Sequence, residues 1–376
     1  MNGLKKLFCA AALCLTATAV WASTFTFKSS TGDSVTFNVP EEFDSFIKEY
    51  EDQIQQAIND NGVSTEDLSN AANEINGHGD ALKSFAEAYN GIEGSLDTFA
   101  GTLLKSIPSA QVGQNQWAQA WIGSLLPTFN MGGGVNVSAA TVDIKPIKSF
   151  CSELGITALD SFNADSIPFP VVAADIRLGG IILPFDIGFS VMKLDTSKID
   201  SLNQAMNGIA LDYFTIGGDI RYAVFKLPLF NFRVSASAGY YYTSTKLSYA
   251  GSSSDMMKGA KLNLETSTFV VGAQASAKFL RILVPFAGAR LMVSNGSMDW
   301  SLTPNWNQLL TGMDSAATYF LPKTFAGKTS SETSWQPQLY VGLGLDLFVV
   351  DITASVGYTF GPNVFNGAVS LRVAWN

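Results

Sequence analysis

Alternating side chains over residues 335–360 constrain the fold more than any other feature of this chain. From Gln338 to Leu347, apolar side chains alternate with small or polar ones, and the alternation resumes from Asp351 to Phe360. A period of two places successive side chains on opposite faces of a strand. Each run has about ten residues, the length of a tilted strand that crosses a bilayer. The pattern is typical of a transmembrane β-hairpin, although a soluble sheet with one buried face also alternates.

The same alternation recurs along residues 131–376, and the candidate strands lie at 135–144, 172–178, 185–191, 214–224, 232–242, 269–279, 283–293, 338–347, 351–360 and 369–376. We expect about ten strands, or more if the longer connections hide others. Short connections near Gly180, Pro228, Leu280 and Val349 alternate with longer ones at 145–168, 195–212, 250–265 and 297–334; only 361–363 breaks this order. This wiring predicts a mainly β fold, an antiparallel transmembrane β-barrel in the bacterial outer membrane.

The first 22 residues predict a secretory signal peptide. Lys5 and Lys6 precede an apolar run, and Ala22 closes a cleavage site of small residues. We expect cleavage after Ala22, and the loss of two positive charges then takes the formal net charge from −9 to −11. A lipoprotein signal is the alternative, because Cys9 and Cys14 lie in the apolar run.

Residues 23–130 have helical rather than alternating periodicity after a short predicted hairpin at 24–39. The apolar spacing predicts helices over 43–58, 64–75 and 81–105, with Pro108 ending the last one. We interpret this region as a small α-helical periplasmic or plug domain ahead of the barrel. The short barrel turns are unusually apolar, so we hypothesise that the apolar stripe of these helices covers them.

Charged residues on the polar side of the candidate strands are expected to face the barrel lumen. They are Asp175, Arg177, Asp186, Asp219, Arg221, Arg233, Lys278, Arg290, Asp346, Asp351 and Arg372. Because their signs nearly balance, they either pair across a filled interior or line a selective pore. The sequence leaves both interpretations open.

Other classes of function are disfavoured by the same sequence. A net charge of −9 argues against a nucleic-acid partner. His78 is the only histidine, and Cys151 is the only cysteine outside the expected signal peptide. A metal site or a histidine-dependent catalytic triad is therefore not expected. We expect no cofactor and no enzymatic activity.

Two stretches resemble uncharacterised outer-membrane β-barrel proteins of spirochaetes, in particular treponemes. They are QAWIGSLLPTFNMGGGVNVSAATVDIKP at 119–146 and IPFPVVAADIRLGGIILPFDIGF at 167–189. The layout is more loosely similar to FadL-like transporters, which also combine an N-terminal plug with a barrel, although their Asn-Pro-Ala hatch motif is absent here. The resemblance implies the fold and the outer-membrane location, and it transfers no functional residue.

The first functional hypothesis is a channel or transporter for small or hydrophobic solutes, with residues 23–130 as its cap or plug. The alternative is a closed structural or adhesive barrel that displays surface loops, mainly 297–334 with Trp300, Trp306 and Tyr319. Under either hypothesis, the expected partners are outer-membrane lipid and the barrel-assembly machinery, with small solutes added for a channel.

Overall fold

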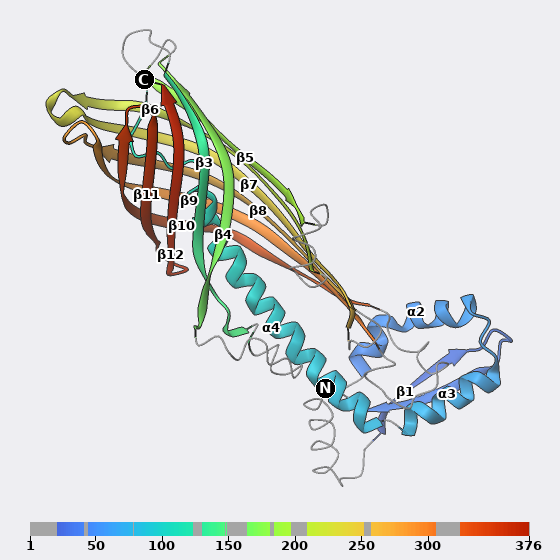
Figure 1. Ribbon diagram of the computed structural model, residues 1–376. Coiled ribbons are helices and arrows are strands. Elements are labelled where there is room, and N and C mark those ends of the chain that lie inside the picture. Colours follow the sequence, from blue (N-terminus) through green and yellow to red (C-terminus); the bar gives the residue numbers. More distant parts are fainter. Residues whose placement is uncertain are drawn as a thin grey trace.

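The computed structural model describes residues 21–40, 44–77, 79–122, 130–146, 148, 164–180, 184–196, 209–251, 257–305 and 324–375. It consists of a β-barrel and an N-terminal module at one end of the barrel, joined by a long helix that enters the barrel interior (Figure 1). Within the described ranges, no helix is both long enough and apolar enough to cross a membrane.

Ten antiparallel strands close the barrel in the order β10-β11-β12-β3-β4-β5-β6-β7-β8-β9. Their bounds are β3 Asn130–Asp143, β4 Ser166–Gly179, β5 Phe185–Asp195, β6 Ile209–Leu227, β7 Phe232–Ala250, β8 Met257–Ser276, β9 Leu283–Pro304, β10 Phe325–Leu347, β11 Val350–Thr359 and β12 Val364–Trp375. Each strand pairs with its sequence neighbours, and the first and last meet where Met131 pairs with Trp375. The prediction of an antiparallel barrel with about ten strands is confirmed.

The alternating pattern sorts side chains between the two faces of the wall as the sequence predicts. On β10, Leu339, Val341 and Leu343 are exposed on the outside, whereas Gln338 and Tyr340 are buried on the inside. The other barrel strands except β9 also present exposed large apolar side chains, among them Val137, Ile176, Phe189, Ile220, Tyr240, Val271, Val356 and Val369. On β9, the exposed outward residues include Ala287 and Ala289. These outward residues form a continuous apolar belt. A lumen that is polar and an outer face that is apolar are the reverse of a soluble barrel and define a transmembrane one.

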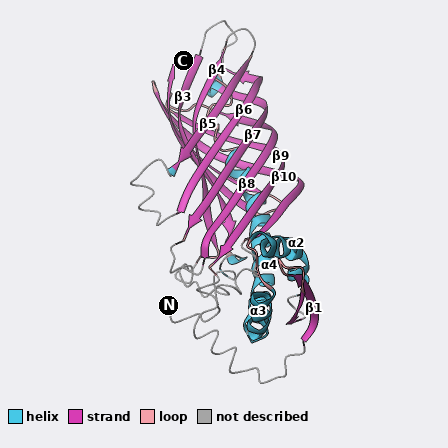
Figure 2. Ribbon diagram, turned by 90° about the vertical axis from the view of Figure 1, so that its right-hand side faces the viewer, coloured by secondary structure: helices cyan, strands magenta, loops and turns pink. Residues whose placement is uncertain are grey.

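The two ends of the barrel differ in length and chemistry. At one end lie the short turns, including the 3-10 turn η4 Leu229–Asn231 and the turn at Phe348. At the other end lie the long connections, where β8, β9 and β10 continue well beyond the belt for total lengths of 20, 22 and 23 residues. Figure 2 shows these tilted strands reaching toward the N-terminal module.

The N-terminal module packs a hairpin against helices. Its elements are β1 Trp21–Lys28, β2 Ser34–Pro40, α2 Asp44–Asp60 and α3 Thr65–Gly77. The hairpin turns at Gly32, whose φ of 96° suits a residue without a side chain. Ser64 caps α3 by accepting from the Asp67 amide at 3.2 Å, while its own hydroxyl donates to the Asp67 carboxylate at 2.6 Å. Phe25, Phe37, Ile58 and Leu68 are buried in the core of the module.

Helix α4, Gly79–Gln111, joins the module to the barrel. The prediction that Pro108 ends this helix is wrong, because three further residues remain helical. Contacts with the wall hold this last turn: the hydroxyls of Ser109 and Thr359 lie 2.8 Å apart, and Ser138 donates to the Ala110 carbonyl at 2.7 Å. A proline removes one helical hydrogen bond, and tertiary contacts here compensate for it.

The hypothesis that the N-terminal helices cover the short turns is also wrong. The module packs at the opposite end, where its core is continuous with Leu264, Met298, Trp300 and Phe325 of the long strands. The short turns instead keep Leu280 and Phe348 at 86% and 88% exposure. Trp300, expected in a surface loop, is buried in this contact.

Several expectations fall on residues outside the described ranges. They concern residues 1–20 of the expected signal peptide, His78, Cys151, Trp306, Tyr319 and the middle parts of the 145–168 and 297–334 connections. The cleavage site after Ala22 remains a prediction.

The belt can be tested by a charge on its lipid face. Leu343→Arg should destabilise the barrel by about 2–4 kcal/mol, because a cation near the bilayer midplane loses its hydration. Urea unfolding in lipid vesicles measures this change. Ala326→Arg, on the same strand but beyond the belt, is the control and should have little effect. Equal effects of the two substitutions would contradict the assignment of the belt.

Candidate functional site

The barrel lumen is filled by the chain itself. Residues 112–122, here called the lumenal strap, follow α4 and run inside the barrel to the end where β3 begins. Between the two ends of the strap, nearly every side chain is buried, including those of Gln114, Trp117 and Trp121. Gly344 of β10 shows how close the contact is, because a Cβ at that position would lie 2.3 Å from the Cβ of Ala118. The wall therefore has no room for a larger residue at this point.

Amide side chains link the strap and the last turn of α4 to the wall near the long-loop end. The Gln111 side chain donates to Thr266 at 2.7 Å and accepts from Thr268 at 2.6 Å. Gln114 donates to Thr215 at 2.8 Å in the same way. Because an amide both donates and accepts, each of these side chains can satisfy two wall groups without adding a charge.

Aromatic and backbone groups of the strap continue these contacts toward the short-turn end. The Trp117 indole donates to Asp175 at 2.8 Å, and the Arg372 guanidinium lies 4.6 Å from the centre of its ring. The Ala120 amide donates to Ser276 at 2.9 Å, and its carbonyl accepts from Ser235 at 2.7 Å. With α4, the strap reaches side chains from every strand of the barrel.

Asp186 is the centre of the charge network in the lumen. Its carboxylate accepts from Arg177 at 2.5 Å, from two nitrogens of Arg221 at 2.8 and 2.7 Å, and from the Ile122 amide of the strap at 2.7 Å. Arg177 also binds Asp219 at 2.7 Å, and Asp219 accepts from the Asn115 side chain. Arg177 and Asp186 are fully buried, so these pairs replace hydration lost on folding.

The remaining candidate residues belong to the same interior. Arg372 pairs with Asp175 at 2.8 Å, and Lys278 pairs with Asp346. Arg233 donates to the Trp121 carbonyl at 2.6 Å, and Arg290 donates to the Val112 carbonyl at 2.9 Å. In these contacts, Arg233 and Arg290 bind strap carbonyls instead of carboxylates, and a carbonyl oxygen carries partial negative charge.

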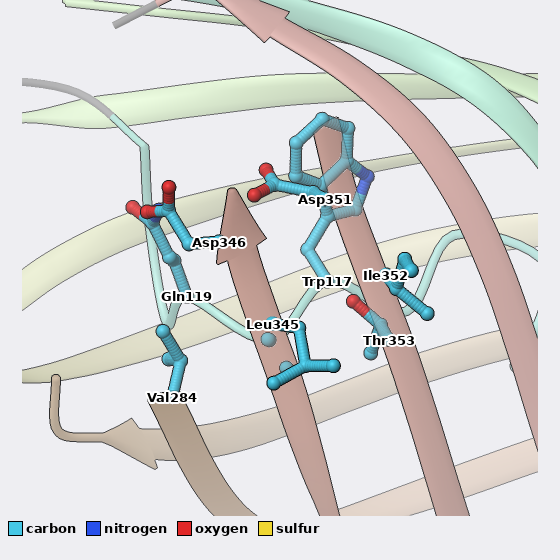
Figure 3. A pocket seen from close by; sticks show the side chains of 10 residues that line it. Trp117, Gln119, Val284, Leu345, Asp346, Asp351, Ile352 and Thr353 are labelled. Atoms are coloured by element: carbon cyan, nitrogen blue, oxygen red, sulfur yellow. The ribbon is translucent and has the colours of Figure 1, made fainter. Parts of the chain in front are cut away.

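Asp351 lies beside a small cavity between the strap and the wall (Figure 3). The cavity holds about 10 Å³, enough for about one water molecule. Asp351 pairs in register with Asp346 on one side and Arg372 on the other. Gln119 of the strap donates to Asp346 at 3.2 Å across the same region. This cavity is too small for a solute to pass.

The expected lumenal charges occupy inward positions. All except Asp351 take part in the network and the strap contacts described above, and Asp351 lines the small cavity beside them. The strap residues were missed by sequence analysis. The run QVGQNQWAQA at 111–120 has no clear helical or strand period. Its signal is composition: uncharged amides with small and aromatic residues, placed directly before the first strand.

Among the described residues, no group of three or more histidine, cysteine, aspartate or glutamate side chains could hold a metal ion. The interactions in the lumen described above are charge pairs and hydrogen bonds, and they fix the strap in place.

The fold and its belt define a transmembrane β-barrel, and comparisons with known proteins add little beyond this. No family model and no curated protein matches the chain. Among solved structures, the outer membrane protease OmpT from Escherichia coli has 10% identity and a TM-score of 0.38, covering 68% of this chain and 99% of OmpT. The translocator domain of autotransporter NalP from Neisseria meningitidis has 9% identity and a TM-score of 0.30, covering 76% and 97%. Ail, the attachment invasion locus protein of Yersinia pestis, has 9% identity and a TM-score of 0.25, covering 65% and 95%. Likenesses at this level carry no argument about activity or origin.

The network predicts a large stability effect from one carboxylate. Asp186→Ala leaves Arg177 and Arg221 without their shared partner, so the free energy of unfolding should fall by about 3–5 kcal/mol. Urea unfolding followed by heat-modifiable gel mobility measures the change. The control is Asp299→Ala, which removes an exposed pair with Lys328 at 3.3 Å and should cost at most about 1 kcal/mol. A small effect at Asp186 would show that the network is not required for stability.

Proposed function

We propose that this chain is a closed outer-membrane barrel that anchors its N-terminal module on the outer face of the membrane. The module comprises residues 21–77 and the part of α4 outside the lumen. The observation that carries the proposal is the strap, which occupies the lumen while the module lies beyond the long strands. The function is then surface display on a filled scaffold.

The filled lumen supports a scaffold over an open channel. A pore needs a continuous water path, and here buried hydrogen bonds of Gln111 at the end of α4 and of Ile122 at the end of the strap hold the segment against the wall. The charged wall residues, which could otherwise line a pore, bind one another and the strap. Each of these contacts would have to break before ions could cross.

The side on which the module lies follows from the connections. Outer-membrane barrels have short turns toward the periplasm and long loops toward the exterior. The N-terminal start of β3 and the C-terminal end of β12 lie at the short-turn end of this barrel. The module is at the other end, so we assign it to the exterior rather than to the periplasm as expected from the sequence.

The second candidate is a channel that opens when the strap leaves. The observation that favours it is the polarity of the wall behind the strap, which includes Thr215, Gln274 and Ser276. Such a wall would hold water if it were vacated.

Conductance separates these two candidates. The refolded full-length chain should show no single-channel current in a planar bilayer, because the strap blocks the lumen. A variant that lacks residues 21–122 should conduct once gel mobility shows that its barrel is folded. Steady current from the intact chain would reject the closed scaffold and favour the channel.

Thiol labelling tests the side of display in a Cys151→Ser background. On intact cells, a membrane-impermeant maleimide should label Ser34→Cys in the module and leave Leu280→Cys at the short turns unlabelled. Both residues are exposed in the structure, so both should react after the outer membrane is permeabilised. The reverse labelling pattern would place the module in the periplasm and reject the proposed function.

A further inference from the structure

The path of the chain through the barrel raises the question of how the module reaches its position. At the long-loop side of the belt, Gln111 binds Thr266 and Thr268, next to the outward belt residue Phe269. At the other side, the Asn130 side chain at the start of β3 donates to the Ile122 carbonyl at 2.7 Å. The end of α4 and the strap together therefore span the height of the belt, and the module and the start of β3 lie at opposite ends of this segment.

We propose that the barrel is the conduit for its own N-terminal module, which crosses unfolded through the lumen and folds on the far side. The inference rests on the proposed function. The barrel then serves first as a translocation path and afterwards as a closed anchor, with the strap as the last segment to enter and the one that seals the lumen.

A route through lipid is unfavourable for this module. Its surface carries exposed charges, among them Lys28, Asp33, Asp52, Glu66 and Asp67. Moving several charged side chains through hydrocarbon costs far more than moving them through a water-filled polar lumen. The wall residues Thr215, Gln274 and Ser276 provide such a lining while the strap is not yet in place.

The dimensions require that the module cross unfolded. A barrel of this size has an interior slightly wider than one that side chains alone can fill. In the structure, the strap and the inward side chains that face it are buried against one another. The folded module has a hairpin and helices around a common core, which is much wider than a single segment. Residues 23–130 contain no cysteine, so no disulfide holds the module folded before it crosses.

Folding on the far side provides the driving force. Apolar residues of the module and of α4, including Leu103 and Leu104, pack against Leu264, Met298 and Trp300 beyond the belt. Removal of this apolar surface from water is favourable. A module that has docked there cannot return without losing this contact, so transfer proceeds in one direction and needs no other energy source.

A covalent lock that forms before the crossing tests the inference. The hydroxyls of Thr31 and Thr65 lie 2.9 Å apart and join the hairpin turn to the start of α3. The test variant is the full chain with Thr31→Cys, Thr65→Cys and Cys151→Ser. In the oxidising periplasm, the two introduced cysteines form a disulfide between positions that are 34 residues apart in the sequence. On intact cells, we expect external protease to cleave only a small fraction of the module in the locked chain. Cleavage should recover when a reductant is present during expression.

The controls are the two single-cysteine variants and the unlocked chain, which carries only Cys151→Ser. Each single cysteine variant should display the module normally, since neither can form the lock. Undiminished surface cleavage of the locked chain, with the disulfide verified by a thiol-blocking gel shift, would overturn the proposal. Loss of cleavage with recovery by reductant supports it, whether the stalled barrel folds or not. If the unlocked chain is not cleaved at the surface, the proposed function itself fails, and the conduit fails with it.

Discussion

The Asp186 carboxylate is the interaction on which the closed lumen depends. It is fully buried and accepts four hydrogen bonds, from Arg177, from two nitrogens of Arg221 and from the Ile122 amide. A buried carboxylate is tolerated only when such partners replace water. Three strands and the strap therefore meet at one group, and the barrel wall and its plug stabilise each other.

The inward face of the long strands changes character along its length. On β8, Gln274 faces the strap, and Thr268 and Thr266 face Gln111 at the end of α4. Leu264 beyond them is apolar and buried against the module. An inward leucine would be unfavourable in a water-filled lumen, whereas it is favourable where the module packs on the strand end. The switch from polar to apolar on one face thus marks the boundary between lumen and docking surface, and it explains why these strands extend beyond the belt.

The barrel could be predicted from the sequence because a strand has a strict period of two and the bilayer favours apolar side chains on one face only. The same period identified the inward charges, such as Arg177 and Asp219. It could not identify their partners, which depend on the register between strands. The strap was missed because QVGQNQWAQA follows the irregular surface of the lumen rather than a period of its own. The continuation of α4 through Pro108 depends on the contacts of Ser109 and Ala110 with the wall, which no local pattern reveals. The side of the module was missed because apolar turns were assumed to need a protein cover, whereas the long strands provide the apolar partner.

The position of the strap inside the closed ring of strands explains both how the module is connected and how the lumen is filled. The strap is held by contacts with strands all around the closed ring, so it cannot enter sideways after the ring has formed. In the route proposed above, its N-terminal end passes along the axis of the ring. The segment that seals the lumen is then the segment that connects the module to the barrel. A barrel with an empty lumen and an attached outer module would need a separate plug, whereas this chain achieves both with residues 112–122.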